Sequence, residues 1–313
     1  MSNQSNITVY LKLLLMALFW GGTFIAGKSL VGNVQPSSAA FLRFTIAAIV
    51  LLIMTLRSQK RFPPIRKNQY LPLFLLGLSG VFGYNIFFFR GLELIEAGRA
   101  AVIIANNPIV IAIFAALFFG EKLNFSKTLG IIISVFGAIV VITHGHPREI
   151  LHNGIGKGEL YIFGCVICWV TYSLVGRAAM RNLSPLVAVT YSALIGAVLL
   201  FPAALIEGIV HQIIHYSLVS WLSLFYLGLC GTVLGFVWYY QGIKKIGSTR
   251  AGQFINFVPI CAILLSAWLL DEPLTLSLLT GVTLVSSGVY LTNRNPARMK
   301  TEKMAAKDGT TLR

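Results

Sequence analysis

The segment Arg99-Ala-Ala-Val-Ile-Ile-Ala-Asn-Asn-Pro108 has a second copy in altered form, Arg250-Ala-Gly-Gln-Phe-Ile-Asn-Phe-Val-Pro259. Each copy runs through an apolar segment to a glutamate, Glu121 in the first and Glu272 in the second. Two glycines then follow in each copy. All five landmarks are separated from their counterparts by the same 151 positions, which indicates an internal duplication of the chain.

The composition is that of a membrane protein. Hydrophobic residues make up 56% of the 313 residues, charged residues only 11%, and the mean hydropathy is +0.79. A bilayer core about 30 Å thick requires apolar helices of roughly 17–25 residues. The sequence predicts an all-α membrane protein with ten such helices, at 11–31, 37–57, 69–89, 97–118, 126–143, 158–176, 184–204, 217–240, 248–269 and 275–292.

The net charge of +15 does not indicate nucleic-acid binding, because the basic residues lie between the apolar runs and form no single patch. If the N-terminus lies in the cytoplasm, the inside segments carry 19 Lys and Arg residues and the outside segments carry five. Basic residues concentrate on the cytoplasmic side of membrane proteins. We therefore expect a multi-pass protein of the cell (inner) membrane with both termini in the cytoplasm.

The duplication and the helix count together define the architecture. Each half has five helices, an odd number, so the second half enters the bilayer from the opposite side. Such inverted repeats build a central cavity near the midplane of many secondary transporters. The predicted parts are a cytoplasmic N-terminus 1–10, a first repeat 11–143, an outside connection 144–157, a second repeat 158–292 and a basic cytoplasmic tail 293–313.

Glycines seven residues apart recur in the fifth and tenth helices, as Gly130 with Gly137 and Gly281 with Gly288. Each pair lies on one helix face, where small residues allow close approach of two backbones. We expect the two helices to pack on each other within one chain. A homodimer contact through the same helices is the alternative.

The chain contains four short motifs, Trp20-Gly21, Leu42-Arg43-Phe44, Gly120-Glu121-Lys122-Leu123 and Asp271-Glu272-Pro273-Leu274. These motifs and their positions resemble the EamA family, the ten-helix branch of the drug/metabolite transporter superfamily. The resemblance covers about 10–292 and implies helices five and ten at the periphery, a central cavity and alternating access. It also implies small metabolites as substrates, commonly amino acids and their derivatives moved outward.

The functional hypothesis is a secondary transporter that exports small metabolites such as amino acids or their derivatives. An importer or exchanger of nucleotide-like or cofactor solutes is the alternative. An enzyme is not expected, because paired carboxylates, a His–Cys metal set and a Ser–His constellation are missing at membrane depth. No cofactor or metal is predicted, and the expected partners are a small-molecule substrate and the lipid bilayer.

The sequence Gly22-Thr-Phe-Ile-Ala-Gly27-Lys28-Ser29 matches the pattern of a phosphate-binding loop. It lies inside the first predicted membrane helix, whereas such a loop follows a strand and exposes its glycines to solvent. We interpret the match as coincidental and expect Lys28 to reach the membrane interface.

Arg43 is the one strong charge in the interior of a predicted membrane helix, away from its ends. A charge in hydrocarbon costs at least about 2.5–3.5 kcal/mol, so its side chain must face the bundle interior or water. One hypothesis is that Arg43 holds a substrate carboxylate. The other is that it ties helix ends together through backbone carbonyls.

Other candidates are amides beside Pro108 and Pro259, which are expected to bend their helices, and aromatic side chains at matching places in the two halves. Hydrogen bonding between helices is the alternative for the amides, and a lipid-facing belt is the alternative for the aromatics. The predicted cavity-lining, substrate-binding residues are Trp20, Phe24, Arg43, Tyr84, Asn85, Asn106, Trp169, Tyr172, Trp238, Tyr239, Gln253 and Asn256.

Glu121 and Glu272 are expected to act as helix caps; a proton relay is the alternative. We assign no role to the five histidines, which fall in predicted outside loops. Since the sequence places no carboxylate at the membrane centre, it does not indicate a driving force for transport.

The inverted topology predicts that Arg66 and the 144–157 connection lie on opposite sides of the membrane. Single cysteines at Arg66 and His146, in a background without the four native cysteines, would be treated with a membrane-impermeant thiol reagent on intact cells. We expect labelling at His146 and none at Arg66 until the cells are broken. Labelling of both positions from the same side would contradict the topology.

Overall fold

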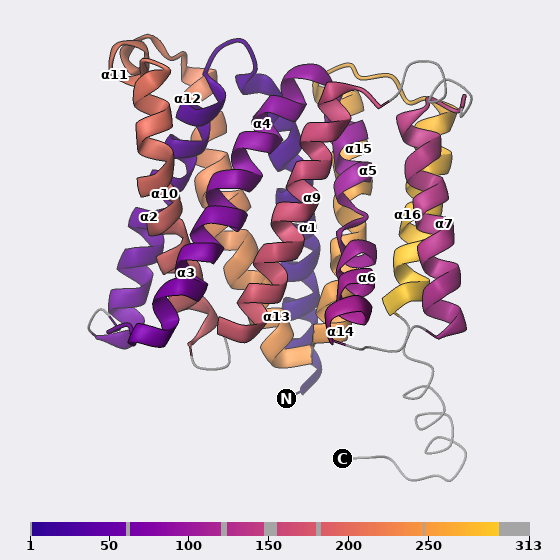
Figure 1. Cartoon of the computed structure of the whole chain (residues 1–313), viewed down its shortest axis with the longest axis horizontal. Coiled ribbons are helices and arrows are strands. Elements are labelled where there is room, and N and C mark those ends of the chain that lie inside the picture. Colours follow the sequence, from indigo (N-terminus) through magenta and orange to yellow (C-terminus); the bar gives the residue numbers. More distant parts are fainter. Residues whose placement is uncertain are drawn as a thin grey trace.

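The computed structural model describes residues 2–60, 63–119, 124–146, 155–179, 183–246 and 248–293, and these form a bundle of helices without strands (Figure 1). Nine helices of the described part are long and apolar enough to cross a membrane, and Leu276–Thr292 is a shorter apolar helix. The expectation of ten helical passages in an all-α membrane protein is thereby confirmed.

The first repeat contains five passages, of which the third and fourth consist of several segments. Its elements are α1 (Ser2–Leu30), α2 (Pro36–Gln59), η1 (Lys67–Gln69), α3 (Tyr70–Leu76), η2 (Gly77–Gly83), α4 (Tyr84–Leu94), α5 (Ala97–Ile104), α6 (Asn107–Phe119) and α7 (Phe125–Ile142).

The second repeat has the same arrangement, with two short helices added between its second and third passages. Its elements are α9 (Lys157–Ala179), α10 (Pro185–Ile206), α11 (Ile209–Gln212), η3 (Ile213–His215), α12 (Leu218–Phe225), η4 (Tyr226–Leu234), α13 (Gly235–Ile246), α14 (Ser248–Gln253), η5 (Phe254–Asn256), α15 (Phe257–Leu269) and α16 (Leu276–Asn293).

Some boundaries differ from the sequence prediction. The segment 1–10, predicted as a separate terminus, is helical from Ser2 onward and continues into the first passage. The passages predicted to end at 89 and 240 continue to Leu94 and Ile246. The additional turns carry charged residues. A prediction based on apolar runs ends before such residues, although the backbone stays helical through them.

The pairing of equivalent helices shows that the second repeat is inverted. In the pair α2 and α10, Phe41 packs on Phe201 while Thr55 hydrogen-bonds with Thr190. The residue numbers rise along one helix as they fall along the other, so the two helices are antiparallel. The pair α7 and α16 is antiparallel as well, because Gly130 lies against Gly288 and Gly137 against Gly281.

The two repeats interlock instead of lying side by side as separate bundles. The third passage of each repeat packs on the first two passages of the other repeat. A Cβ added to Gly77 would lie 2.6 Å from Ile195, and a Cβ added to Gly228, its counterpart, would lie 2.9 Å from Ile46. Glycine is needed at both positions because the helices of different repeats cross there in direct backbone contact.

The middle of the third passage is π-helical in both repeats, at η2 and at η4. The fourth passage is interrupted in both repeats, at Ala105–Asn106 and at η5. The sequence predicted the interruptions from Pro108 and Pro259. It did not predict the π-helical segments, which contain no proline.

Helices α7 and α16 lie together at one edge of the bundle, opposite α2 and α10 (Figure 1). This confirms the peripheral position that the family resemblance implies. The glycine faces of the two helices are used within one chain, where a Cβ on Gly130 would lie 2.5 Å from the carbonyl oxygen of Gly288. The homodimer stays a prediction, and it would require the outer faces of these helices.

The α7–α16 contact predicts that Gly130→Leu destabilises the folded protein, because the new side chain meets the backbone of α16. Overpacking of this kind costs about 1–3 kcal/mol or more. Thermal unfolding in detergent would measure the effect. The control is Val135→Leu, at an exposed position of the same helix, and equal midpoints for both variants would contradict the packing.

Candidate functional site

Arg43 lies in the second turn of α2, about 10 Å along the helix from its start. The residue is 8% exposed. Its Nη1 donates to Asn85 Oδ1 at 3.0 Å, and its Nε donates to Thr232 Oγ1 at 3.3 Å. Arg43 thus joins α2 to the third passages of both repeats.

This arrangement corrects one hypothesis about Arg43. Its hydrogen-bond partners are side chains from the interior of two other passages, and not the backbone carbonyls of helix ends. Both partners are neutral. The guanidinium also stands over the ring of Phe44, 5.3 Å from the ring centroid. No carboxylate of the described residues pairs with Arg43.

The two partners of Arg43 are held in place by the backbone of their own helices. Asn85 Nδ2 donates to the carbonyl oxygen of Val81 at 2.7 Å, which leaves Asn85 Oδ1 directed at Arg43. Thr232 Oγ1 donates to the carbonyl oxygen of Leu227, five residues earlier, at 2.9 Å. The Asn85 amide and the Thr232 hydroxyl each donate a hydrogen bond to the backbone of their own helix. The oxygen atom of each side chain is therefore oriented to accept a hydrogen bond from the guanidinium of Arg43.

Aromatic rings from α1, α4, α9 and α13 form a continuous network beside Arg43. Trp169 lies at its centre and contacts Tyr84, Tyr172 and Phe236 at centroid distances of 5.8, 5.4 and 6.2 Å. Phe236 connects Trp169 to Trp20 at 5.6 Å. The rings come from both repeats, so the network lies where the two repeats meet.

Six of the predicted aromatic residues belong to this network, which also includes Phe88 and Tyr240. Phe24 packs edge-on against Phe88, which stacks on Tyr84. The predicted pair Arg43 and Asn85 is in direct contact. The predicted members of the network are Trp20, Phe24, Tyr84, Trp169, Tyr172 and Tyr239.

The remaining predicted residues lie elsewhere. Asn106 donates to the carbonyl oxygens of Val102 and Ile103 and accepts from Ser134 on α7, so it makes the hydrogen bond between helices that was the alternative reading. Trp238 stacks on Phe19, apart from the network. Gln253 is exposed and Asn256 is half-buried at the interruption of the ninth passage, and neither makes a ring contact.

Sequence reasoning missed Thr232, Phe236 and Tyr240. They follow one another at intervals of four residues and therefore share a face of the eighth passage. This spacing was available in the sequence. It gave no decisive signal by itself, and only the tertiary structure shows which face meets Arg43.

The end of the bundle away from Ser2, uppermost in Figure 1, comprises the segments 31–35, 143–146, 207–217 and 270–275 and is called the distal end here. Two carboxylates cap helices of the first repeat there. Glu272 accepts from the backbone N–H groups of Ala97 and Gly98 at 2.7 and 3.0 Å. Glu207 accepts in the same way from Ser37 and Ser38 at 3.0 and 2.8 Å.

These caps replace groups that the capped helices lack. Neither α2 nor α5 has an N-cap side chain that accepts a hydrogen bond, and a carboxylate at a helix N-terminus is stabilised by the free N–H groups and the helix dipole. The expectation that Glu272 is a cap is confirmed, although the capped helix belongs to the other repeat. Glu121 lies outside the described residues.

Arg99 makes a third link at the distal end. Its Nη2 pairs with Glu159 in the first turn of α9 at 2.6 Å, and the two side chains are 14% and 6% exposed. The same atom donates to the carbonyl oxygen of Ile142, and Nη1 contacts His144 Nε2 at 2.7 Å. Because a guanidinium only donates, His144 Nε2 is the acceptor in this contact.

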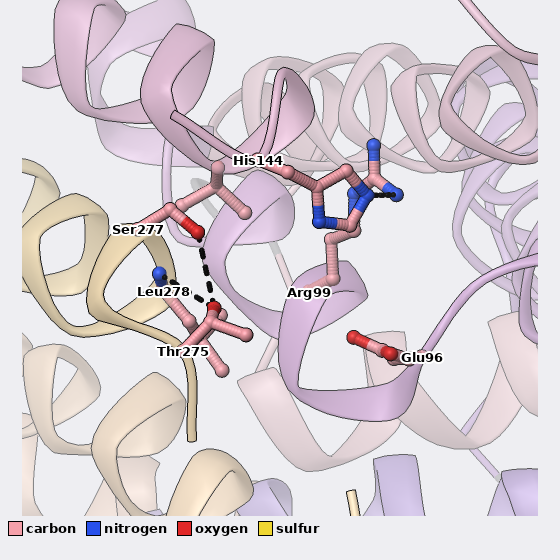
Figure 2. A pocket seen from close by; sticks show the side chains of 7 residues that line it. Glu96, Arg99, His144, Thr275, Ser277 and Leu278 are labelled. Carbon is pink, nitrogen blue, oxygen red and sulfur yellow. Dashed lines mark hydrogen bonds between the residues drawn. The ribbon is translucent and has the colours of Figure 1, made fainter. Parts of the chain in front are cut away.

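Figure 2 shows Arg99 and His144 facing each other at a small pocket between α5, α7 and the start of α16. Glu96 and Thr275 also line the pocket. Its volume is about 10 Å³, which is at the lower limit for one water molecule. It is therefore too small for a metabolite, and the polar groups around it connect helices.

Lys28 reaches the distal end as expected but is not simply solvated there. Its Nζ donates to the carbonyl oxygens of Leu92 and Ile95, at 2.7 and 2.8 Å, and so caps the C-terminus of α4. This contact gives the lysine of the accidental phosphate-loop pattern a structural partner.

The sequence profile described as the EamA-like transporter family matches residues 7–143 and again 156–294. The chain belongs to the EamA-like transporter family. It is therefore a multi-pass membrane protein of a family of transporters, and the resemblance inferred from its motifs is confirmed.

Several similar proteins are named as transporters or as an efflux pump. The chain is 32% identical over 287 residues to the uncharacterized transporter YyaM of Bacillus subtilis, covering 91% of this chain and 93% of that protein. It is 26% identical to a protein of Escherichia coli named as a probable amino-acid metabolite efflux pump, covering 89% and 92%. A solved crystal structure superposes with a TM-score of 0.60 at 22% identity, covering 91% and 98%, which supports the fold.

The buried pair at the distal end predicts that Glu159→Gln destabilises the protein, because Arg99 loses its carboxylate while it stays mostly buried. Breaking a buried pair in this way costs about 3–5 kcal/mol. Thermal unfolding would be compared with Glu93→Gln, which removes the exposed partner of Arg90 and should cost about 0–1 kcal/mol. Similar losses in both variants would contradict the assigned role of Glu159.

Proposed function

We propose that this chain is a secondary transporter that exports amino acids or their derivatives by alternating access. The observation that carries the proposal is the interlocked pair of inverted repeats, with Arg43 and the aromatic network at their junction. Inverted repeats supply two related conformations, each open to one side of the membrane, around a site that stays in place.

The junction favours small solutes with both polar and apolar parts. It combines one cation, two neutral polar side chains and several aromatic rings, a composition typical of small-molecule sites. The name of the Escherichia coli relative adds support for amino-acid metabolites and for outward movement. The substrate and the direction are thus proposals that rest on a site composition and on one related protein.

The links at the distal end define what would have to change during transport. The Arg99–Glu159 pair and the caps made by Glu207 and Glu272 all join the two repeats. If the distal end faces outward, as the basic residues predict, opening to the outside requires these contacts to break. Because they are short and charge-assisted, substrate binding must compensate for their loss.

Transport would be measured in everted membrane vesicles, in which export appears as uptake. A panel of radiolabelled amino acids and acetylated amino acids would be applied with and without an imposed pH gradient. We expect severalfold greater uptake of at least one compound than in vesicles without the protein, abolished when the vesicles are made leaky. Equal uptake with and without the protein for the whole panel would contradict amino-acid export.

A further inference from the structure

The two repeats share a backbone arrangement but differ in side-chain polarity at their junction. Counterparts are offset by 149 residues in the first two passages and by 151 in the third. Four pairs of counterparts surround the junction: Thr23 and Tyr172, Arg43 and Ser192, Val81 and Thr232, and Asn85 and Phe236.

Contacts in the structure confirm that these offsets identify true counterparts. A Cβ added to Gly231 would meet Thr23, and a Cβ added to Gly80 would meet Tyr172. The contact of Gly242 with Leu13 is likewise matched by that of Gly91 with Ile162. Each glycine thus meets the same position of the opposite repeat, so the junction has an approximate two-fold axis.

The side chains do not follow this symmetry. Thr23, Arg43, Asn85 and Thr232 lie on one side of the junction, where Asn85 and Thr232 bind Arg43 and a Cβ on Gly231 would lie 3.8 Å from Arg43 Nη2. We call these four residues the polar pole. Three of their four counterparts are Tyr172, Val81 and Phe236, which are aromatic or aliphatic.

The aromatic side is defined here as the aromatic pole, consisting of Tyr84, Trp169, Tyr172 and Phe236. Trp169 contacts the other three rings. All four are partly exposed although they belong to passages at the centre of the bundle. Tyr84 directly precedes Asn85, and Phe236 follows Thr232 by about one helical turn, so the two poles are neighbours.

The charge of Arg43 is not balanced within the described part of the chain. The side chain is more than nine-tenths buried, its two hydrogen-bond acceptors are neutral, and Nη2 has no hydrogen-bond partner among the described residues. A buried cation in a membrane is costly unless it is paired with an anion. An anion that accepts a hydrogen bond from Nη2 would balance the charge of Arg43.

We propose that the transported solute binds with a carboxylate at Arg43 Nη2 and with a flat apolar or aromatic body against the aromatic pole. This inference deepens the proposed function and rests on it. Asn85 and Thr232 act as positioning residues, because they fix the guanidinium through Nη1 and Nε. The broken symmetry of the poles then orients an asymmetric solute within a nearly symmetric fold.

The single positive charge of Arg43 favours binding of a solute with one negative charge over binding of a phosphate ester. Among the residues whose burial is described, Arg43 is the most buried Lys or Arg, and it is the one cation of the polar pole. A phosphate monoester carries close to two charges at neutral pH and is usually held by several cationic or N–H groups. A carboxylate is neutralised by a single guanidinium, so the polar pole disfavours nucleotide-like solutes.

The test uses the purified full-length protein in detergent and measures binding by thermal stabilisation and calorimetry. The probes are L-phenylalanine, L-tryptophan and 3-phenylpropanoate, each beside its primary amide, with L-alanine as the probe that lacks a ring. We expect at least one aromatic carboxylate to bind about tenfold or more tightly than its amide, since a charge-assisted hydrogen bond is lost. L-Alanine should bind more weakly than that compound.

Three variants test whether Arg43 is responsible for the preference. Arg43→Gln should remove the preference for carboxylate over amide, and Arg43→Lys should retain part of it. Thr283→Ala, at an exposed position of the peripheral α16, should retain all of it. A purely structural Arg43 would lower the unfolding midpoint without changing the ratio of the two affinities, and this outcome would overturn the proposal.

If Arg43→Gln does not fold, the affinities of the wild-type protein for each carboxylate and its amide still test the proposal. Equal affinities for every carboxylate and its amide, or no binding by any carboxylate, would overturn the inference by itself. The vesicle assay separates this failure from failure of the proposed function. Export without carboxylate preference refutes only the binding mode, whereas absence of any amino-acid export refutes the proposed function as well.

Discussion

Close backbone contact between helices of different repeats is the constraint on which this structure depends. Apolar side chains gain little by leaving lipid for the interior of a membrane protein, so association has to come from packing and hydrogen bonds. Gly77 and Gly228 place the two third passages directly against the opposite repeat, and Gly130 and Gly288 do the same for α7 and α16. The repeats are joined because each passage finds its closest partner in the other half.

This interlocking determines where polar groups can be placed. Asn85 and Thr232 belong to different repeats, yet both bind Arg43 because η2 and η4 enter the opposite half. Within the π-helical η4, the Thr232 hydroxyl donates to the carbonyl oxygen of Leu227, five residues earlier. At the distal end, Glu207 and Glu272 cap helices that have no capping side chain of their own. Polar contacts between the repeats therefore occur both inside the bundle and at its end.

Function follows from the difference between a symmetric backbone and asymmetric side chains. The inverted repeats provide two equivalent arrangements of helices, as alternating access requires. A site on the symmetry axis would be symmetric if the side chains followed the backbone. Instead Arg43 faces a set of rings, which gives the junction a charged side and an apolar side suited to a solute with two unlike ends.

Much of this could be read from the sequence. The constant offset and the odd number of helices per half determined the inverted repeat, because each apolar run of this length must cross the bilayer once. Pro108 and Pro259 predicted the interruptions, and the isolated charge of Arg43 predicted a buried position. The motifs were sufficient to identify the family.

The tertiary structure alone decided which helix faces meet. Asn106 and Asn85 are equally plausible polar contacts in sequence, yet the first binds Ser134 on the peripheral α7 and the second binds Arg43. The partner of Arg99, Glu159, is 60 residues away and belongs to the other repeat. A passage that is apolar on every side carries no periodic signal for its inner face, so rotation about the helix axis is determined only by packing against neighbours.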